Sequence, residues 1–337
     1  MSTEVSSTKA GEDNADDDRS LIYYKWDWKS APFAAPTSKT KNARAIVCLV
    51  FHGLHSHGRY GHTSFMAESC LRVLDSHRKE QETQHQKAYE IAVYSVDLPG
   101  HGEAKGTRGL LQFPDCVDHA VIAARAVWKM HADAEGGIVL HLMGSSMGGS
   151  IAVLCAARLE KEMRACGSSE AKPLEVASVI LSAPLVKVRN PPSSTLVGIL
   201  QGISWVAPSL AILSAPTGDP SWQYRDPVRC AACAGDSLEY SGRLRLGSGE
   251  TAIMITRIIP DEVAALKKTG MLVLAPTDER IVDGDATMTL CELATNLPDS
   301  LKRLHCCPLA RHGVFGEPPD ALLEIEMALS SWIAKFQ

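Results

Sequence analysis

The pentapeptide Gly-Ser-Ser-Met-Gly at residues 144–148 constrains the fold of this chain more than any other feature. It follows an apolar run at residues 138–143 and precedes residues 149–159, whose side chains favour a helix. Glycines two residues before and after a serine permit a tight turn from a strand into a helix, because a side chain at either position would collide with the backbone. The pattern therefore predicts that Ser146 lies at the apex of a strained turn.

Such a turn gives Ser146 the position of a nucleophile. Its hydroxyl would lie above the carboxyl end of the strand, and the backbone N–H of Met147 would point to the same place from the start of the helix. A helix N-terminus favours negative charge, so this N–H is suited to an oxyanion. The alternative is a glycine-rich turn that only packs tightly, and the partners of Ser146 elsewhere in the chain decide between the two.

Continuous apolar runs alternate with helical segments along most of the chain. The runs that are typical of strands buried on both faces of a parallel sheet are residues 45–51, 89–96, 177–184, 271–275 and 301–307. We expect helices at residues 65–75, 115–130 and 321–335, and an antiparallel edge strand at residues 21–29. With 337 residues, 45% of them hydrophobic, the chain can bury one large α/β core.

The alternation stops at residue 185 and resumes with a helix at residues 261–268. We therefore predict a core formed by residues 21–184 and 260–337, into which residues 185–259 are inserted as a cap. Residues 1–20 contain six acidic side chains and no apolar run, so we expect a disordered acidic tail and not an export signal.

Within the insertion, residues 196–213 are strongly apolar, but Gly198, Gly202 and Pro208 interrupt them. The segment is too short and too broken to span a membrane. It suits an apolar cover over a site, and this cover could also make peripheral contact with a membrane.

Charge and cysteine usage exclude several classes of partner. The net charge of −5, without a cluster of basic residues, argues against nucleic acid. Ten cysteines are scattered without regular spacing, which together with the lack of an export signal favours reduced thiols and a cytoplasmic location. Cys230 and Cys233 form one C-x-x-C pair without a second pair, so we expect no metal or redox role for them.

A loop that begins with His52 and Gly53 follows the strand at residues 45–51. Glycine lets this loop approach the nucleophile closely, so the N–H of Leu54 can act with that of Met147 as an oxyanion donor. Each such donor stabilises a transition state by about 3 kcal/mol. The four histidines of this region, His52, His55, His57 and His62, also raise the possibility of a metal site. No carboxylate lies among them, and we predict neither metal nor cofactor.

The candidate base is found by elimination. Only His305 and His312 follow Ser146 in the chain, and His305 falls inside an expected strand. His312 lies just past that strand in a loop with Gly313, where it can reach the edge of the sheet. His101, in the turn at residues 97–102, precedes the nucleophile, and we expect it to stabilise the turn.

An acidic partner for His312 is expected in the loop after the strand at residues 271–275. Asp278, Glu279 and Asp283 are the candidates, and Asp283 is better explained as a helix N-cap. Asp278 and Glu279 are adjacent, and a loop can rotate either side chain inward, so the choice between them stays open. An ionised carboxylate there would fix the tautomer of His312 and stabilise its imidazolium form.

Together these motifs resemble the α/β-hydrolase superfamily, and within it the monoacylglycerol lipase and lysophospholipase-like serine hydrolases. The resemblance extends from about residue 45 to the C-terminus. It is carried by the Gly-Ser-Ser-Met-Gly turn, by the His-Gly loop followed by residues 57–60, by residues 97–102 and 106–108, and by residues 236–242 in the insertion. It implies a mostly parallel central sheet with helices on both faces and an inserted helical cap.

The resemblance also implies roles for individual residues. Ser146 would be the nucleophile, His312 the base, and the N–H groups of Leu54 and Met147 the oxyanion donors. The acid position of the family falls on Glu279, with Asp278 one residue away. A glutamate can serve as the acid if its loop lies slightly further back.

The substrate implied by the resemblance is a carboxylic ester with a long acyl chain, cleaved through an acyl-enzyme. Monoacylglycerol, hydrolysed to fatty acid and glycerol, is the first candidate. The alternatives are a lysophospholipase, for which Arg189 or Arg243 could bind phosphate, or a broad carboxylesterase. A hypothesis of a different class is a non-catalytic binding protein built on the hydrolase fold.

Overall fold

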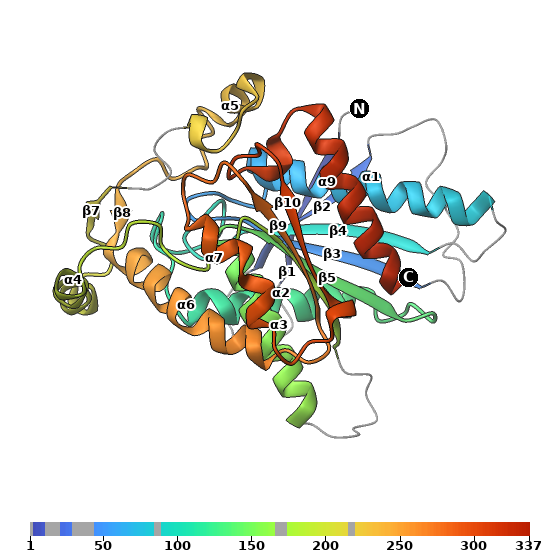
Figure 1. Ribbon diagram of the computed structural model, residues 1–337, viewed down its shortest axis with the longest axis horizontal. Coiled ribbons are helices and arrows are strands. Elements are labelled where there is room, and N and C mark those ends of the chain that lie inside the picture. Colours follow the sequence, from blue (N-terminus) through green and yellow to red (C-terminus); the bar gives the residue numbers. More distant parts are fainter. Residues whose placement is uncertain (1–2, 11–20, 29–43, 84–88, 166–173, 215–219) are drawn as a thin grey trace.

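The computed structural model describes residues 3–10, 21–28, 44–83, 89–165, 174–214 and 220–337. Its centre is a sheet of eight strands covered by helices on both faces (Figure 1). In spatial order the strands are β1 (Thr3–Ala10), β2 (Leu21–Trp28), β4 (Glu90–Val96), β3 (Ala45–Phe51), β5 (Ile138–Ser145), β6 (Val176–Ser182), β9 (Gly270–Pro276) and β10 (Lys302–Cys307). The six strands from β4 to β10 are parallel, and β1 and β2 join them as antiparallel neighbours.

Two groups of helices cover the sheet. One face packs against α1 (Gly61–Thr83) and α9 (Pro319–Ile333). The other face packs against α2 (Asp115–Met130), α3 (Met147–Ala165), α6 (Leu246–Ala265), α7 (Gly284–Met288) and α8 (Leu290–Leu293). Short 3-10 helices are η1 (Pro220–Trp222), η2 (Asp299–Leu301), η3 (Val314–Gly316) and η4 (Ala334–Phe336).

The continuous apolar runs are explained by burial on both faces. In β3, Val47 and Leu49 belong to the core under α2 and α3, whereas Cys48 and Val50 belong to the core under α1 and α9. Successive side chains of a strand point to opposite faces, so a strand covered on both sides needs an apolar residue at every position. The predicted α/β fold class is confirmed.

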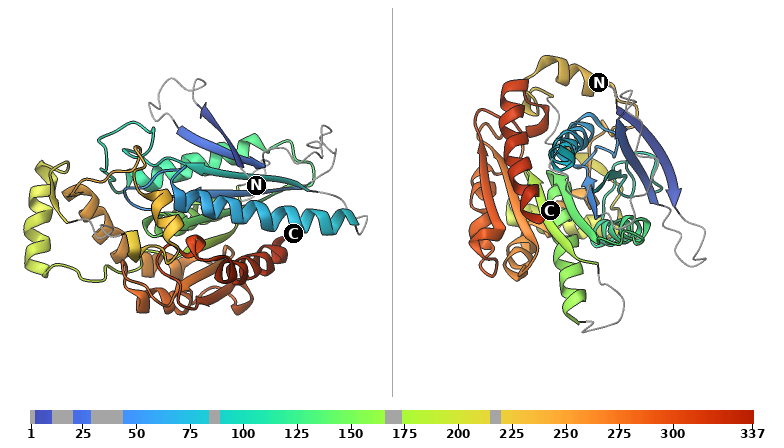
Figure 2. Two further views of the ribbon diagram at one scale, coloured as in Figure 1. Left: turned by 90° about the horizontal axis from the view of Figure 1, so that it is seen from above. Right: turned by 90° about the vertical axis from the view of Figure 1, so that its right-hand side faces the viewer.

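Between β6 and β9 the chain leaves the sheet. This segment contains α4 (Ser194–Val206), β7 (Ala211–Leu213), α5 (Pro227–Cys233) and β8 (Leu244–Arg245), and then the beginning of α6. Figure 1 and the left view of Figure 2 show α4 and the β7–β8 ribbon at one end of the molecule, beyond the sheet.

Two expectations from the sequence differ from the structure. Residues 3–10 of the expected disordered tail form β1, which pairs with β2 along its whole length, so β2 is not the edge of the sheet. Residues 1–2 and 11–20 of that tail lie outside the described residues. By pairing with β2, the backbone of residues 3–10 gains hydrogen bonds along one side, and acidic composition does not predict such pairing.

The helix expected at residues 261–268 is the end of a longer helix, α6, which begins at Leu246 and continues through Pro260. Its buried side chains Ile255, Ile259 and Val263 follow at intervals of four and join the main core. That stripe anchors the second half of α6 under the sheet, while its first half reaches the inserted segment. The predicted boundary at residue 259 therefore falls inside one helix.

Candidate active site

Ser146 lies at the turn between β5 and α3. Its φ is 55°, a backbone conformation that residues other than glycine rarely adopt. A Cβ atom at Gly144 would lie 2.3 Å from the carbonyl oxygen of Gly148, and one at Gly148 would lie 2.3 Å from that of His52. Both glycines are therefore required by close backbone approach, as the sequence predicts. The strained turn is held by Ser182 and Leu185, whose backbone groups bond to those of Ser146 at 3.0 Å.

The His-Gly loop lies directly against this turn. A Cβ atom at Gly53 would be 3.4 Å from the Cβ atom of Ser146, which is an ordinary van der Waals distance, so the loop lies in contact with the turn. Nδ1 of His52 donates to the carbonyl of Gly53 at 2.7 Å, and its Nε2 accepts from the N–H of Leu98 at 2.9 Å. Burial lowers the pKa of His52 to about 3, so the ring stays neutral and keeps this tautomer.

These bonds orient the peptide that joins Gly53 to Leu54. The carbonyl and the N–H of a trans peptide point in opposite directions. Because His52 holds the Gly53 carbonyl on its own side, the N–H of Leu54 is directed to the opposite side. Met147 begins α3, and the N–H of a first helical residue has no acceptor within its helix. Leu54 and Met147 both line the cavity at Ser146.

A buried carboxylate ties the neighbouring turns together. Asp97 accepts hydrogen bonds from the hydroxyl of Tyr24 at 2.7 Å and from the backbone N–H groups of Gly58 at 2.6 Å and Glu103 at 2.7 Å. It thus joins β2, the His-Gly loop and the turn at residues 97–102. His101 in that turn is buried, and its Nδ1 lies 2.9 Å from the carbonyl of Pro99. The predicted role of His101 in the turn is confirmed.

His312 follows β10 and contacts Glu279, which follows β9. Nδ1 of His312 lies 2.9 Å from Oε2 and 3.1 Å from Oε1 of that carboxylate. Oε1 also accepts from the N–H groups of Ile281 at 2.7 Å and Val282 at 3.1 Å. The carboxylate is therefore fixed by the backbone of its own loop, and the imidazole is held with Nδ1 toward it and Nε2 away from it.

Two opposing influences act on the pKa of Glu279. Burial raises this pKa and is the largest influence. The pKa is lowered by the electrostatic interaction with His312 and by the hydrogen bonds from His312, Ile281 and Val282. The balance places the pKa of Glu279 below its ordinary value. The carboxylate is therefore ionised at neutral pH, the state in which it can stabilise an imidazolium.

The other two candidate carboxylates have different partners. Asp278 is partly exposed and forms ion pairs with Arg280 at 2.8 Å and Arg311 at 3.4 Å, which hold its pKa below its usual range. Asp283 caps α7 by accepting from the N–H of Ala286 at 3.0 Å, which confirms its prediction as an N-cap. Of the three, Glu279 is the one that contacts His312.

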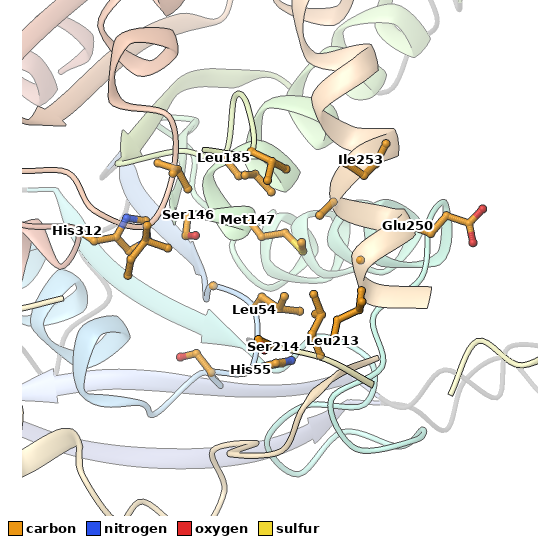
Figure 3. Close-up of a pocket in the computed structure, with 18 of the residues that line it drawn as sticks. Leu54, His55, Ser146, Met147, Leu185, Leu213, Ser214, Glu250, Ile253 and His312 are labelled. Carbon is orange, nitrogen blue, oxygen red and sulfur yellow. The ribbon is translucent and has the colours of Figure 1, made fainter. Parts of the chain in front are cut away.

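The turn, the His-Gly loop and the His312 loop open onto a cavity of about 350 Å³. In Figure 3 the side chains of Ser146 and His312 both border this cavity. Most of its wall comes from the inserted segment and is apolar, with contributions from Leu185, Val188, Val197, Leu200, Leu213, Leu244, Leu246, Ala252 and Ile253. An apolar cavity of this size suits a hydrocarbon chain next to the candidate nucleophile.

Helix α4 presents two apolar faces. Val197, Leu200 and Gln201 line the cavity. The rest of the helix surface is exposed, with Trp205 at 89% and Val206 at 78% of their surface accessible, and it also includes Leu196, Ile199 and Ile203. Leu210 and Ile212 extend this exposed surface toward β7. In the described part of the chain, no helix is both long and apolar enough to span a membrane.

The segment around η1 contacts the His312 loop through a backbone hydrogen bond, side-chain packing and an ion pair. The N–H of Gly313 donates to the carbonyl of Gln223 at 2.7 Å, and the ring of Tyr224 fills the space that a side chain at Gly313 would need. Arg225 forms an ion pair at 2.5 Å with the fully buried carboxylate of Glu317. This part of the insertion therefore braces the loop that carries the candidate base.

The sequence did not indicate that several polar residues line the cavity. Tyr60, His62, Gln223 and Glu239 all line it. Tyr60 and Glu239 fall within motifs that carry the family resemblance, but nothing in their spacing along the chain indicates that they face one cavity. Tyr60 precedes α1 and Glu239 lies between α5 and β8, and only the folded chain brings their side chains together.

The candidate metal ligands are separated in the structure. Among the residues that the structure describes, no three His, Cys, Asp or Glu side chains are grouped closely enough to hold a metal ion. His57 instead bonds to Asp236 through Nε2 at 2.9 Å, and His55 packs against the ring of Tyr240. Cys230 and Cys233 are not joined by a disulfide.

Comparisons with known proteins agree with this architecture. The protein family described as serine aminopeptidase, S33, also called Hydrolase_4, matches residues 75–319. Human monoglyceride lipase is 25% identical over 306 residues, which cover 88% of this chain and 84% of the relative.

Solved structures show the same fold at lower identity. The monoacylglycerol lipase of Paleococcus ferrophilus superposes with a TM-score of 0.64 at 20% identity, over 86% of this chain and 95% of its own. The monoglyceride lipase of Saccharomyces cerevisiae, a soluble variant in complex with a substrate analogue, has a TM-score of 0.69 at 15% identity, over 100% and 96% of the two chains. The predicted α/β-hydrolase fold is confirmed by these neighbours.

Proposed function

Because this chain belongs to the Hydrolase_4 family of α/β hydrolases, we propose that it is a serine hydrolase that cleaves monoacylglycerol to fatty acid and glycerol. The observation that carries the proposal is that Ser146 and His312 both line an apolar cavity, while Glu279 contacts the imidazole of His312. The similarity to human monoglyceride lipase supports the choice of substrate.

In the proposed acylation step, Nε2 of His312 takes the proton of Ser146 as its oxygen attacks the ester carbon. The carbonyl oxygen becomes an oxyanion, which accepts hydrogen bonds from the N–H groups of Leu54 and Met147. Glu279 holds the imidazole in the required tautomer and stabilises its positive charge. His312 then gives the proton to the departing glycerol oxygen, which leaves an acyl group on Ser146.

Deacylation repeats these roles with water. His312 takes a proton from the water molecule that attacks the acyl carbon, and the second oxyanion occupies the same two N–H donors. Collapse of this intermediate returns the proton from His312 to Ser146 and releases the fatty acid. We propose that residues 185–259 act as the cap, whose apolar side chains bind the acyl chain during both steps.

The contacts of the two arginines suggested by the sequence favour a neutral head group over a phosphate. Arg189 donates to the backbone carbonyl of Glu279, and Arg243 donates to that of Ile212. Neither lines the cavity, and no Lys or Arg is among the described residues that do. A lysophospholipid would therefore lack the cationic partner that its phosphate requires.

The proposal is tested by measuring wild-type turnover of 2-oleoylglycerol, oleoyl lysophosphatidylcholine and a short soluble ester. We expect kcat/KM for the glycerol ester to exceed that for the lysophospholipid about tenfold or more, since an unpaired phosphate in the cavity is costly. A reversed preference would make the chain a lysophospholipase, and equal rates on all three would make it a broad carboxylesterase. The absence of turnover on every ester would contradict the proposal.

We also propose that the exposed face of α4 makes peripheral contact with a membrane, from which a lipid substrate can enter the cavity. Replacing Trp205 and Val206 together by serine removes two of the most exposed apolar side chains of this face. We expect binding to phosphatidylcholine vesicles in a sedimentation assay to fall about tenfold, because less apolar surface enters the bilayer. Turnover of the short soluble ester should stay unchanged.

A matched control is available on α9, which lies over one face of the sheet and away from α4 (Figure 1). Replacing Leu323 and Met327 by serine also removes two exposed apolar side chains, and we expect no effect on vesicle binding. An equal loss of binding in both variants would show that exposed apolar area in general, and not α4, is responsible.

A further inference from the structure

Glu239 places a carboxylate in the same cavity as Ser146 and His312. Among the described residues, its side chain has one hydrogen-bond partner, the hydroxyl of Tyr60, which lies 3.4 Å from Oε1. A carboxylate can accept about four hydrogen bonds. Most of the accepting capacity of Glu239 is therefore available to a molecule in the cavity.

The charge of Glu239 is poorly compensated by its surroundings. Burial raises the pKa of this carboxyl, the hydrogen bond from Tyr60 lowers it, and the negative charge of Asp236 raises it again, so that the net shift is upward. No Lys or Arg lines the described cavity, and residues 215–219, outside the described ranges, contain neither. Such a carboxylate gains from hydroxyl donors and is opposed by a second anion.

His62 adds a second polar group to the cavity. It is buried, it lines the cavity, and neither of its ring nitrogens has a hydrogen-bond partner among the described residues. Burial lowers the pKa of His62 to about 3, so the ring is neutral and offers one donor and one acceptor. A hydroxyl group is likewise both donor and acceptor, which makes a polyol complementary to His62 and Glu239 together.

We propose that Glu239 is the specificity-determining residue for the head group of the substrate. Its carboxylate accepts hydrogen bonds from the free hydroxyls of an uncharged polyol ester, of which a glycerol monoester is the fitting class, and it excludes head groups that carry a phosphate. The inference rests on the proposed function, because the head group concerned belongs to the ester that Ser146 cleaves. It adds a residue that distinguishes neutral from anionic esters.

The test compares three esters of one acyl chain in the full-length protein. Oleoylglycerol has two free hydroxyls, oleoyl lysophosphatidic acid adds a phosphate, and methyl oleate has no head-group hydroxyl. Glu239→Gln keeps the shape of the side chain and removes its charge. We expect kcat/KM to fall about tenfold for oleoylglycerol, to rise about tenfold for lysophosphatidic acid and to stay unchanged for methyl oleate.

Glu250→Gln is the matched control. Glu250 also borders the cavity, but Figure 3 shows its carboxylate directed away from Ser146. The same change of charge there should leave all three rates as in the wild type. If Glu239→Gln leaves the ratio between the esters unchanged, or lowers the turnover of methyl oleate equally, Glu239 does not select the head group. If the wild type cleaves none of the esters, the proposed function itself fails.

Discussion

Replacing Ser146 by alanine is expected to lower kcat for 2-oleoylglycerol by about 10⁵- to 10⁶-fold, to near the rate without enzyme. The acyl-enzyme cannot form without the hydroxyl, and the base and oxyanion donors alone retain only a small part of the rate enhancement. Turnover assays and covalent labelling by a fluorophosphonate probe measure this directly. The variant should fold, because serine contributes only its hydroxyl at a turn held by backbone contacts of Ser182 and Leu185.

The neighbouring serine provides the control. Ser145 is the last residue of β5, and Ser145→Ala makes the same chemical change one position earlier. We expect its turnover to remain within about threefold of the wild type. Ester cleavage or probe labelling that persists in Ser146→Ala would remove Ser146 from the mechanism. A wild-type protein that the probe does not label would instead support the hypothesis of a non-catalytic binding protein.

The second large effect is expected for Glu279→Gln, with a loss in kcat of about 10³- to 10⁴-fold. A glutamine amide can neither fix the tautomer of His312 nor stabilise its positive charge. The change is nearly isosteric, and Oε1 of a glutamine can still accept from Ile281 and Val282, as that of Glu279 does. Single-turnover measurements of the acyl-enzyme would show whether the loss lies in the chemical step.

Asp278→Asn is the paired variant, and its kcat should stay near that of the wild type. It removes the ion pairs of a partly exposed carboxylate with Arg280 and Arg311, and ion pairs that solvent reaches contribute little to stability. If Asp278→Asn loses activity while Glu279→Gln keeps it, the proposed assignment of the acid is reversed. If both lose activity equally, the loop acts as a unit and neither carboxylate can be singled out.

The pH dependence of stability follows from the direction of the pKa shift of Glu279. Because the pKa in the folded state lies below the ordinary value of 4.5, the interaction with His312 contributes its full stability above that pH. This contribution is lost as the pH falls through the lower pKa of the folded state. The difference in Tm between the wild type and Glu279→Gln should therefore be largest near neutral pH and shrink in acid.

The two carboxylates of this loop show where sequence reasoning stops. Asp278 and Glu279 are adjacent, and both satisfy the chain order in which the acid follows Ser146 and precedes His312. In the folded chain, Asp278 forms ion pairs with two arginines on the outer side of the loop. The carboxylate of Glu279 instead accepts hydrogen bonds from the N–H groups of Ile281 and Val282 on the inner side. One of those arginines, Arg311, comes from a different loop, so no local pattern around Asp278 contains the information.

The amino-acid order alone was enough for the features that depend on local sterics and burial. The glycines around Ser146 indicated the turn, because a Cβ atom there meets backbone a few residues away, and the apolar runs indicated strands covered on both faces. The contact between His312 and Glu279, the pairing of β1 and the entry of Glu239 into the cavity required the folded chain. Each joins segments distant in sequence, and their approach depends on the packing of the whole core, which spacing along the chain does not record.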